Sequence, residues 1–183
     1  MSQALVTILV DALCALTVRD AAASQELVHN AVQELPTHAG LRFLYGSLLM
    51  DAGNNEQAIE NLRHAYALDP ANPLIGIQLG LSYFDAGKIQ EALQIWQAAD
   101  QESASTDVRA YLSGLVALAK GDIQDAKLQI ESGLSIGSAN QALAVNMRTL
   151  CAKIDHMLQA DGPDDADTGH ILLGQYSRNG GEM

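Results

Sequence analysis

The residue types that most often carry chemistry are scattered along this chain rather than grouped. Five histidines, His29, His38, His64, His156 and His170, form no HExxH pattern and stand beside no cysteine pair. None therefore has the spacing of a metal ligand. No GxxxxGKS/T or GxGxxG pattern follows a predicted strand, so a phosphate-binding loop is not indicated. We expect no catalytic residue, no cofactor and no metal, and hence a protein that is not an enzyme.

The two cysteines, Cys14 and Cys151, stand near opposite ends of the chain. Neither belongs to a CxxC pattern or adjoins a basic cluster, and residues so far apart in a helical chain rarely meet the geometry of a disulfide. We expect reduced, packed thiols. The alternative is an intermolecular bridge or a redox sensor.

Composition narrows the class of protein. The chain has 183 residues, 48% of them hydrophobic and only 4% aromatic, which favours one all-α domain. Its net charge of -12 excludes nucleic-acid binding and works against an anionic membrane surface. Residues 4–18 are apolar like a secretory signal, but Asp11 interrupts them and no Lys or Arg precedes them. We therefore expect a packed first helix, no membrane insertion and a cytoplasmic protein.

Small residues recur every 34 positions. The series that keep this interval are Gly46, Gly80 and Gly114; Gly53, Gly87 and Gly121; and Ala58, Ala92 and Ala126. A glycine inside a helix costs about 1 kcal/mol relative to alanine. We expect close approach of two antiparallel helices, as between Gly80 and Ala92, to offset that cost. The second glycine, as at Gly87, ends the first helix in a left-handed conformation.

A 34-residue period of paired helices resembles the tetratricopeptide repeat family. The resemblance implies an all-α fold, a right-handed superhelical solenoid of helical hairpins with a C-terminal capping helix. We place a tetratricopeptide domain at residues 1–160 and an acidic linker and tail, with a short apolar segment, at 161–183. Within the domain we expect a degenerate hairpin at 2–36, repeats at 39–72, 73–106 and 107–140, and a capping helix at 140–159.

The last repeat departs from the pattern. Gly133 replaces the alanine of the second helix and Ser138 replaces the terminating proline, so we expect looser packing there. The capping helix offers an apolar stripe that would cover the last hairpin, because the end of a solenoid must be shielded. The stripe is Leu143, Val145, Met147, Leu150, Ile154 and Leu158.

In this family the first helix of each repeat lines a concave wall, and the resemblance places a partner-binding groove there. The wall residues would be Phe43, Ser47, Met50, Leu74, Ile77, Leu81, Phe84, Val108, Tyr111, Leu115 and Leu118. They are almost all apolar and lack the Lys, Arg and Asn with which some relatives clamp carboxylates. The resemblance therefore implies an adaptor, scaffold or chaperone for a protein or peptide with apolar anchors.

Two alternatives stay open at this point. The chain also resembles, in architecture alone, the translocator chaperones of bacterial type III secretion. The groove could instead be covered by a second copy or by the chain's own tail, through Ile171, Leu172, Leu173 and Tyr176. In that case the acidic convex face near Glu56 and Glu60 would be the partner surface.

Overall fold

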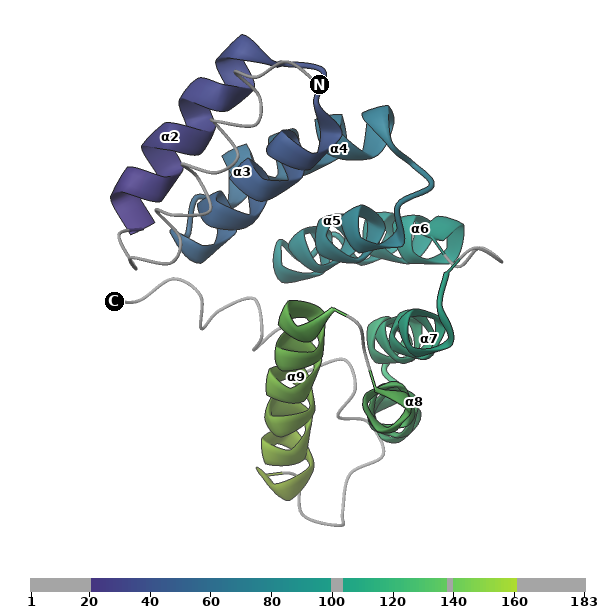
Figure 1. Cartoon of the computed structure of the whole chain (residues 1–183). Coiled ribbons are helices and arrows are strands. Elements are labelled where there is room, and N and C mark those ends of the chain that lie inside the picture. The colour runs from purple at the N-terminus through teal and green to yellow at the C-terminus, as the bar shows by residue number, and fades with distance from the viewer. Residues whose placement is uncertain (1–20, 100–103, 138–139, 161–183) are drawn as a thin grey trace. The chain divides into compact units, whose positions relative to one another are not determined.

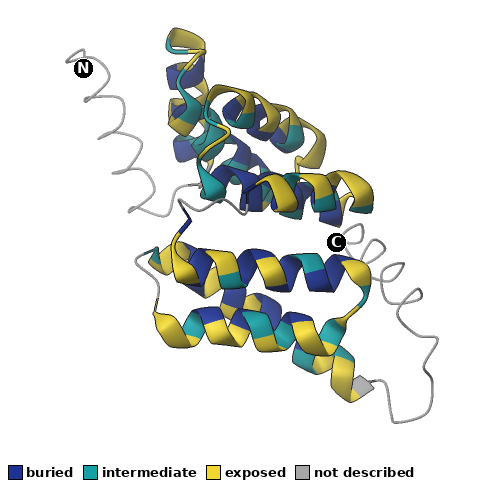
Figure 2. Ribbon diagram, turned by 90° about the vertical axis from the view of Figure 1, so that its right-hand side faces the viewer, coloured by how far each residue is buried: buried dark blue, intermediate teal, exposed yellow. Residues whose placement is uncertain are grey.

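A computed structural model describes residues 21–99, 104–137 and 140–160. Every regular element in these ranges is a helix, which confirms the predicted all-α fold of helical hairpins (Figure 1). The helices are α2 (Ala21–Glu34), α3 (Ala39–Asp51), α4 (Asn55–Leu68), α5 (Pro73–Asp85), α6 (Ile89–Ala99), α7 (Thr106–Lys120), α8 (Ile123–Ile136) and α9 (Gln141–Ala160). Their buried and exposed positions form separate stripes, as amphipathic helices do (Figure 2).

The chain divides into two compact units, and the boundary between Ser82 and Tyr83 falls inside α5. We call residues 1–82 the N-terminal unit and residues 83–183 the C-terminal unit, and describe each by itself.

In the N-terminal unit, α3 and α4 form a close hairpin around Gly46. A Cβ atom at Gly46 would lie 2.7 Å from Leu62 Cγ and 3.2 Å from the Ala58 carbonyl oxygen. Leu62 and Ala58 are themselves fully buried. The absence of a side chain at Gly46 therefore permits the helix approach that the repeat spacing predicts.

Helix α2 packs on the opposite side of α3. Val28, Ala31 and Val32 of α2 form a buried cluster with Leu41 of α3. Partly buried apolar side chains surround this cluster: Leu35, Leu44, Tyr45 and Leu48. The start of α3 is fixed by His38, whose Nδ1 accepts a hydrogen bond from the Leu41 backbone N–H at 3.2 Å. This histidine is a helix cap, which satisfies one of the first N–H groups of the helix.

The three turn glycines behave as the sequence predicts. Gly53, Gly87 and Gly121 have φ angles of 77°, 73° and 87°, the left-handed region that favours glycine. Each follows the first helix of a hairpin and lets the chain reverse into the second.

The C-terminal unit contains a second close hairpin, α7–α8. A Cβ atom at Gly114 would lie 2.5 Å from Ile130 Cγ1 and 2.9 Å from the Ala126 carbonyl oxygen. The prediction that Gly133 loosens this repeat is wrong. A Cβ atom there would lie 2.5 Å from Tyr111 Cε1, so the missing methyl group makes room for the buried tyrosine ring.

Helix α9 follows α8 and buries the stripe Leu143, Ala144, Met147, Leu150, Cys151 and Ile154. Two residues assigned to this stripe from the sequence are exposed, Val145 by 55% and Leu158 by 36%. Val145 lies two positions from Leu143, about 200° around the helix, so it cannot share the buried face.

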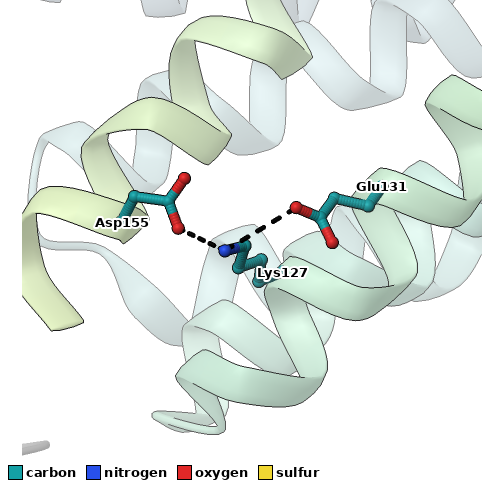
Figure 3. A network of polar contacts seen from close by, with 3 residues as sticks. All are labelled: Lys127, Glu131 and Asp155. Atoms are coloured by element: carbon teal, nitrogen blue, oxygen red, sulfur yellow. Dashed lines mark hydrogen bonds and ion pairs between the residues drawn. The ribbon is translucent and has the colours of Figure 1, made fainter.

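Lys127 of α8 connects α8 to α9. Its Nζ atom hydrogen-bonds Asp155 Oδ1 of α9 and lies 3.7 Å from Glu131 Oε1 of α8 (Figure 3). Asp155 is half-buried. This ion-pair network therefore holds the outer side of α9 beside α8.

Several sequence predictions fall outside the described residues. They concern the first helix of the degenerate hairpin with Cys14, the terminating Ser138, and the tail 161–183 with His170 and the apolar segment. The described part of that hairpin, which was predicted at 2–36, contains helix α2.

Candidate partner-binding surface

The residues predicted to line a partner groove form two groups that differ in solvent exposure. Five are half-buried: Phe43, Ser47, Met50, Leu74 and Leu81. All five belong to the N-terminal unit, where they lie on α3 and on α5. The other six are buried: Ile77, Phe84, Val108, Tyr111, Leu115 and Leu118. The accessible part of the predicted wall is therefore the surface made by the first five residues, which we call the α3–α5 surface.

Helical geometry explains why α3 presents this surface. One side of α3 meets α4 at Gly46, and a second side, with Leu44 and Leu48, packs against the α2 cluster. The remaining side carries Phe43, Ser47 and Met50 at the i, i+4, i+7 spacing of a single helix face. Two packed neighbours thus leave one mainly apolar face of α3 half-exposed.

Met50 joins this face of α3 to α5. Its sulfur accepts hydrogen bonds from Gln78 Nε2 at 3.1 Å and from Ser82 Oγ at 2.8 Å. Ser82 Oγ also lies 2.8 Å from the Gln78 carbonyl oxygen, one turn earlier in the helix. Ser47 Oγ donates to the Phe43 carbonyl oxygen at 3.0 Å. The side-chain donors Ser47, Gln78 and Ser82 are thus engaged inside the unit.

The electrostatics of the two helices agree with the absence of a carboxylate clamp. Arg42 is the one basic residue of α3, and α5 has none. Arg42 donates from Nη1 to Asn61 Oδ1 at 2.9 Å and from Nε to the Pro36 carbonyl oxygen at 3.2 Å. Asp51 closes α3, and partial burial raises the pKa of its carboxyl group above 3.8. Helix α3 therefore carries an acidic side chain at its C-terminal end.

The predicted residues of the third repeat are packed inside the C-terminal unit. Tyr111 is fully buried against Gly133, and Val108, Leu115 and Leu118 are buried as well. A partner would reach them only after the α7–α8 hairpin rearranged. Periodicity identifies residues that share a stripe, but it does not tell whether neighbouring helices cover that stripe.

A pocket in the N-terminal unit had no signal in the sequence. It is open, has a volume of about 320 Å³, and is lined by Ala22, Gln25, Glu26, His29 and Tyr45. The His29 and Tyr45 rings lie 5.3 Å apart between centroids. These residues come from α2 and α3, and only the packing of one helix on the other brings them together. The sequence shows His29 only as one of five scattered histidines, with no sign of its contact with Tyr45.

No metal-binding arrangement stands out in the described ranges, since they contain no group of three or more His, Cys, Asp or Glu side chains that could hold an ion. Within the same ranges, no helix has both the length and the apolar character needed to cross a membrane. Glu56 and Glu60 of α4 are exposed, as the alternative acidic surface requires.

Comparison with known proteins now identifies the class. Residues 49–115 match the tetratricopeptide repeat family model. This part of the chain therefore carries tetratricopeptide repeats, and the resemblance inferred from the 34-residue period is confirmed. No curated protein sequence matches the chain.

Several differently named proteins have solved structures with a similar fold. PilF of Pseudomonas aeruginosa is 18% identical, with a TM-score of 0.62 over 99% of this chain and 78% of that one. MamA of Desulfovibrio magneticus RS-1 is 9% identical, with a TM-score of 0.60 over 98% and 94%. A variant O-GlcNAc transferase of Thermobaculum terrenum is 21% identical, with a TM-score of 0.55 over 68%. This chain spans only 24% of that transferase. At these identities the likeness is one of fold.

Proposed function

We propose that this protein is a non-enzymatic, cytoplasmic adaptor or chaperone that holds an apolar partner segment on the α3–α5 surface. The tetratricopeptide fold supports a role in protein–protein interaction in general. The observation that carries the more specific proposal is the half-exposed set Phe43, Met50, Leu74 and Leu81 on two helices of one unit. Apolar side chains gathered on one surface favour a protein partner over open water.

The partner class follows from what the surface offers. Its donors are engaged by Met50 and by helix carbonyl groups, and the cation of α3 is engaged by Asn61. A partner that needs charged anchoring groups would find few free donors there. A helical or extended segment with apolar side chains gains free energy by covering Phe43 and its neighbours, and aromatic residues often dominate such interfaces.

Paired charge substitutions test this proposal once a partner has been purified. Phe43→Glu and Leu81→Glu each place a carboxylate on the surface, and we expect either to weaken partner binding at least tenfold, measured by titration calorimetry. Leu128→Glu is the matched control, because Leu128 is 64% exposed on α8 in the other unit. Circular dichroism establishes that all three variants keep their helices. Equal affinity of Phe43→Glu and Leu128→Glu would place the binding site elsewhere.

The tail offers a second candidate occupant. Residues 171–176 carry Ile171, Leu172, Leu173 and Tyr176 after an acidic linker, so they have the apolar anchors that such a surface accepts. Deleting residues 161–183 distinguishes a surface that the tail covers from a surface that is free for a partner. Tighter partner binding by the shortened chain supports a competing tail in the same chain or in a second copy, whereas unchanged binding and oligomeric state contradict it. The likeness to type III secretion chaperones stays a prediction that identification of the partner would test.

A further inference from the structure

The Met50 sulfur occupies an unusual position for a thioether on a partly open surface. Gln78 Nε2 and Ser82 Oγ, both from α5, approach it at 3.1 Å and 2.8 Å. Met50 is half-buried, whereas Ser82 is only 4% exposed. The Met50 side chain is therefore partly open to solvent, while polar atoms of α5 contact its sulfur.

Near this sulfur, two acceptors of unequal strength compete for one hydroxyl hydrogen. The Ser82 hydroxyl group has a single hydrogen, yet it lies 2.8 Å both from the Met50 sulfur and from the Gln78 carbonyl oxygen. A thioether is a weak acceptor and a carbonyl oxygen is a strong one. The site thus places polar donors around a sulfur that uses them weakly, and a stronger acceptor at that position would compete for them.

We propose that Met50 is an oxidation site, at which a hydroperoxide converts the thioether to a sulfoxide and thereby opens the contact between α3 and α5. A sulfur lone pair attacks the terminal peroxide oxygen, and the O–O bond breaks as the S–O bond forms. The leaving oxygen takes the proton of the transferred oxygen. Sulfur is oxidised, the peroxide is reduced to water or an alcohol, and no other group is consumed. Methionine sulfoxide is polar and can be reduced back enzymatically.

Distances explain why the contact would open. A sulfoxide oxygen that accepts from Ser82 needs about 2.7 Å to Oγ in addition to the S–O bond. The present sulfur-to-Oγ distance of 2.8 Å cannot contain both. Either α5 moves away from Met50, or the new oxygen turns outward and the oxidised, electron-poorer sulfur accepts more weakly from Gln78 and Ser82. Both outcomes loosen the hydrogen-bonded contact between α3 and α5. An effect of Met50 oxidation on partner binding rests on the proposed function. The loosening of the contact between α3 and α5 does not depend on it.

The test treats the full chain with hydrogen peroxide, locates each added oxygen by peptide mass spectrometry, and measures amide hydrogen exchange in α3 and α5. The chain has five methionines, of which Met147 is buried and Met157 half-buried. We expect oxidation at Met50 and exchange roughly two- to tenfold faster near Met50 and Ser82, as expected when one such hydrogen bond is lost. Incubation with methionine sulfoxide reductases should restore the original exchange.

Two variants distinguish this mechanism from general oxidative damage. Met50→Leu keeps the volume of the side chain but has no sulfur, so peroxide should leave its exchange in α3 and α5 unchanged. Ser82→Ala makes room for the sulfoxide oxygen, so its oxidised form should show a smaller change than the oxidised wild type. The proposal is overturned if Met50 stays unmodified while Met157 is oxidised, or if oxidised Met50 leaves the exchange unaltered. A peroxide effect of full size in Met50→Leu would also overturn it, since another residue would then be responsible.

Discussion

Replacing Gly114 with alanine tests the physical basis of the repeat. Alanine is favoured over glycine in a helix by about 1 kcal/mol, so the substitution would stabilise an isolated helix. In this hairpin the added Cβ atom would meet Ile130 Cγ1 at 2.5 Å and the Ala126 carbonyl oxygen at 2.9 Å. Overpacking of a well-packed core costs about 1–3 kcal/mol. The carbonyl group belongs to the backbone and cannot rotate away, so we expect a cost near the upper end and a net loss of about 1–2 kcal/mol.

Trp96 provides the assay for this change. It is the single tryptophan of the chain, is fully buried, and lies in the C-terminal unit with α7 and α8. Urea unfolding followed by its fluorescence gives the free energy of unfolding of that unit. Ser113→Ala, at an exposed position of α7, is the control for helix propensity and should stabilise by a few tenths of a kcal/mol.

A double-variant cycle identifies the cause. Ile130→Ala removes the side-chain atom nearest the new Cβ, so Gly114→Ala should cost less in the Ile130→Ala background, by about 0.5–3 kcal/mol. Stabilisation by Gly114→Ala equal to the propensity gain would refute the close-approach reasoning. An unchanged cost in the Ile130→Ala background would instead assign the whole penalty to the backbone contact.

Three further predictions concern the C-terminal unit. Gly121→Ala should destabilise it by about 1–2 kcal/mol in the same urea assay, because φ is 87° at that residue and its surroundings are open, so the cost comes from the backbone alone. In a Cys14→Ser background, Cys151 should react slowly with a disulfide reagent in the folded protein and rapidly in urea. The reason is that burial raises the pKa of the Cys151 thiol above 9.0 and limits the access of the reagent to it. Equal rates in the folded protein and in urea would contradict the packing of Cys151. Lys127→Met should speed this labelling by freeing α9. The hydrogen bond to Asp155 raises the pKa of Lys127 above 10.5. In the wild type, the contribution of this ion pair to the shielding of Cys151 is therefore fully present below pH 10.5 and is lost as the pH rises through the higher folded-state pKa of Lys127. Labelling with an unchanged rate in Lys127→Met would show that the ion pair does not hold α9.

The elements that could be predicted from the sequence are those fixed by local geometry. Gly53, Gly87 and Gly121 indicate turns with a left-handed backbone conformation, because few other residues adopt that conformation. Gly46 and Gly114 indicate close helix contacts because a glycine inside a helix is costly, and tight packing of a neighbouring helix is one interaction that offsets the cost. Such signals depend on one residue and its immediate neighbours, so they can be recognised in the sequence without knowledge of the tertiary structure.

The candidate site could be predicted only in part, because exposure depends on how helices pack. Phe43 and Tyr111 occupy equivalent repeat positions, yet the first is half-buried and the second fully buried. Tyr111 packs against Gly133, a residue distant in the sequence whose missing methyl group admits the ring. The error at Val145 had a simpler cause: an apolar residue was assigned to a buried stripe that its angular position excludes. The His29–Tyr45 pocket required the packing of α2 on α3, which periodicity cannot supply.

The most direct test of partner binding by the α3–α5 surface is site-specific photo-crosslinking in cells. A photoreactive phenylalanine analogue at position 43, on the α3–α5 surface, is compared with the same analogue at position 128, which is exposed in the other unit. If the α3–α5 surface holds an apolar partner segment, position 43 captures one protein in high yield, through a segment with apolar side chains, and position 128 does not. Capture of that protein from position 128 with no capture from position 43 would contradict it.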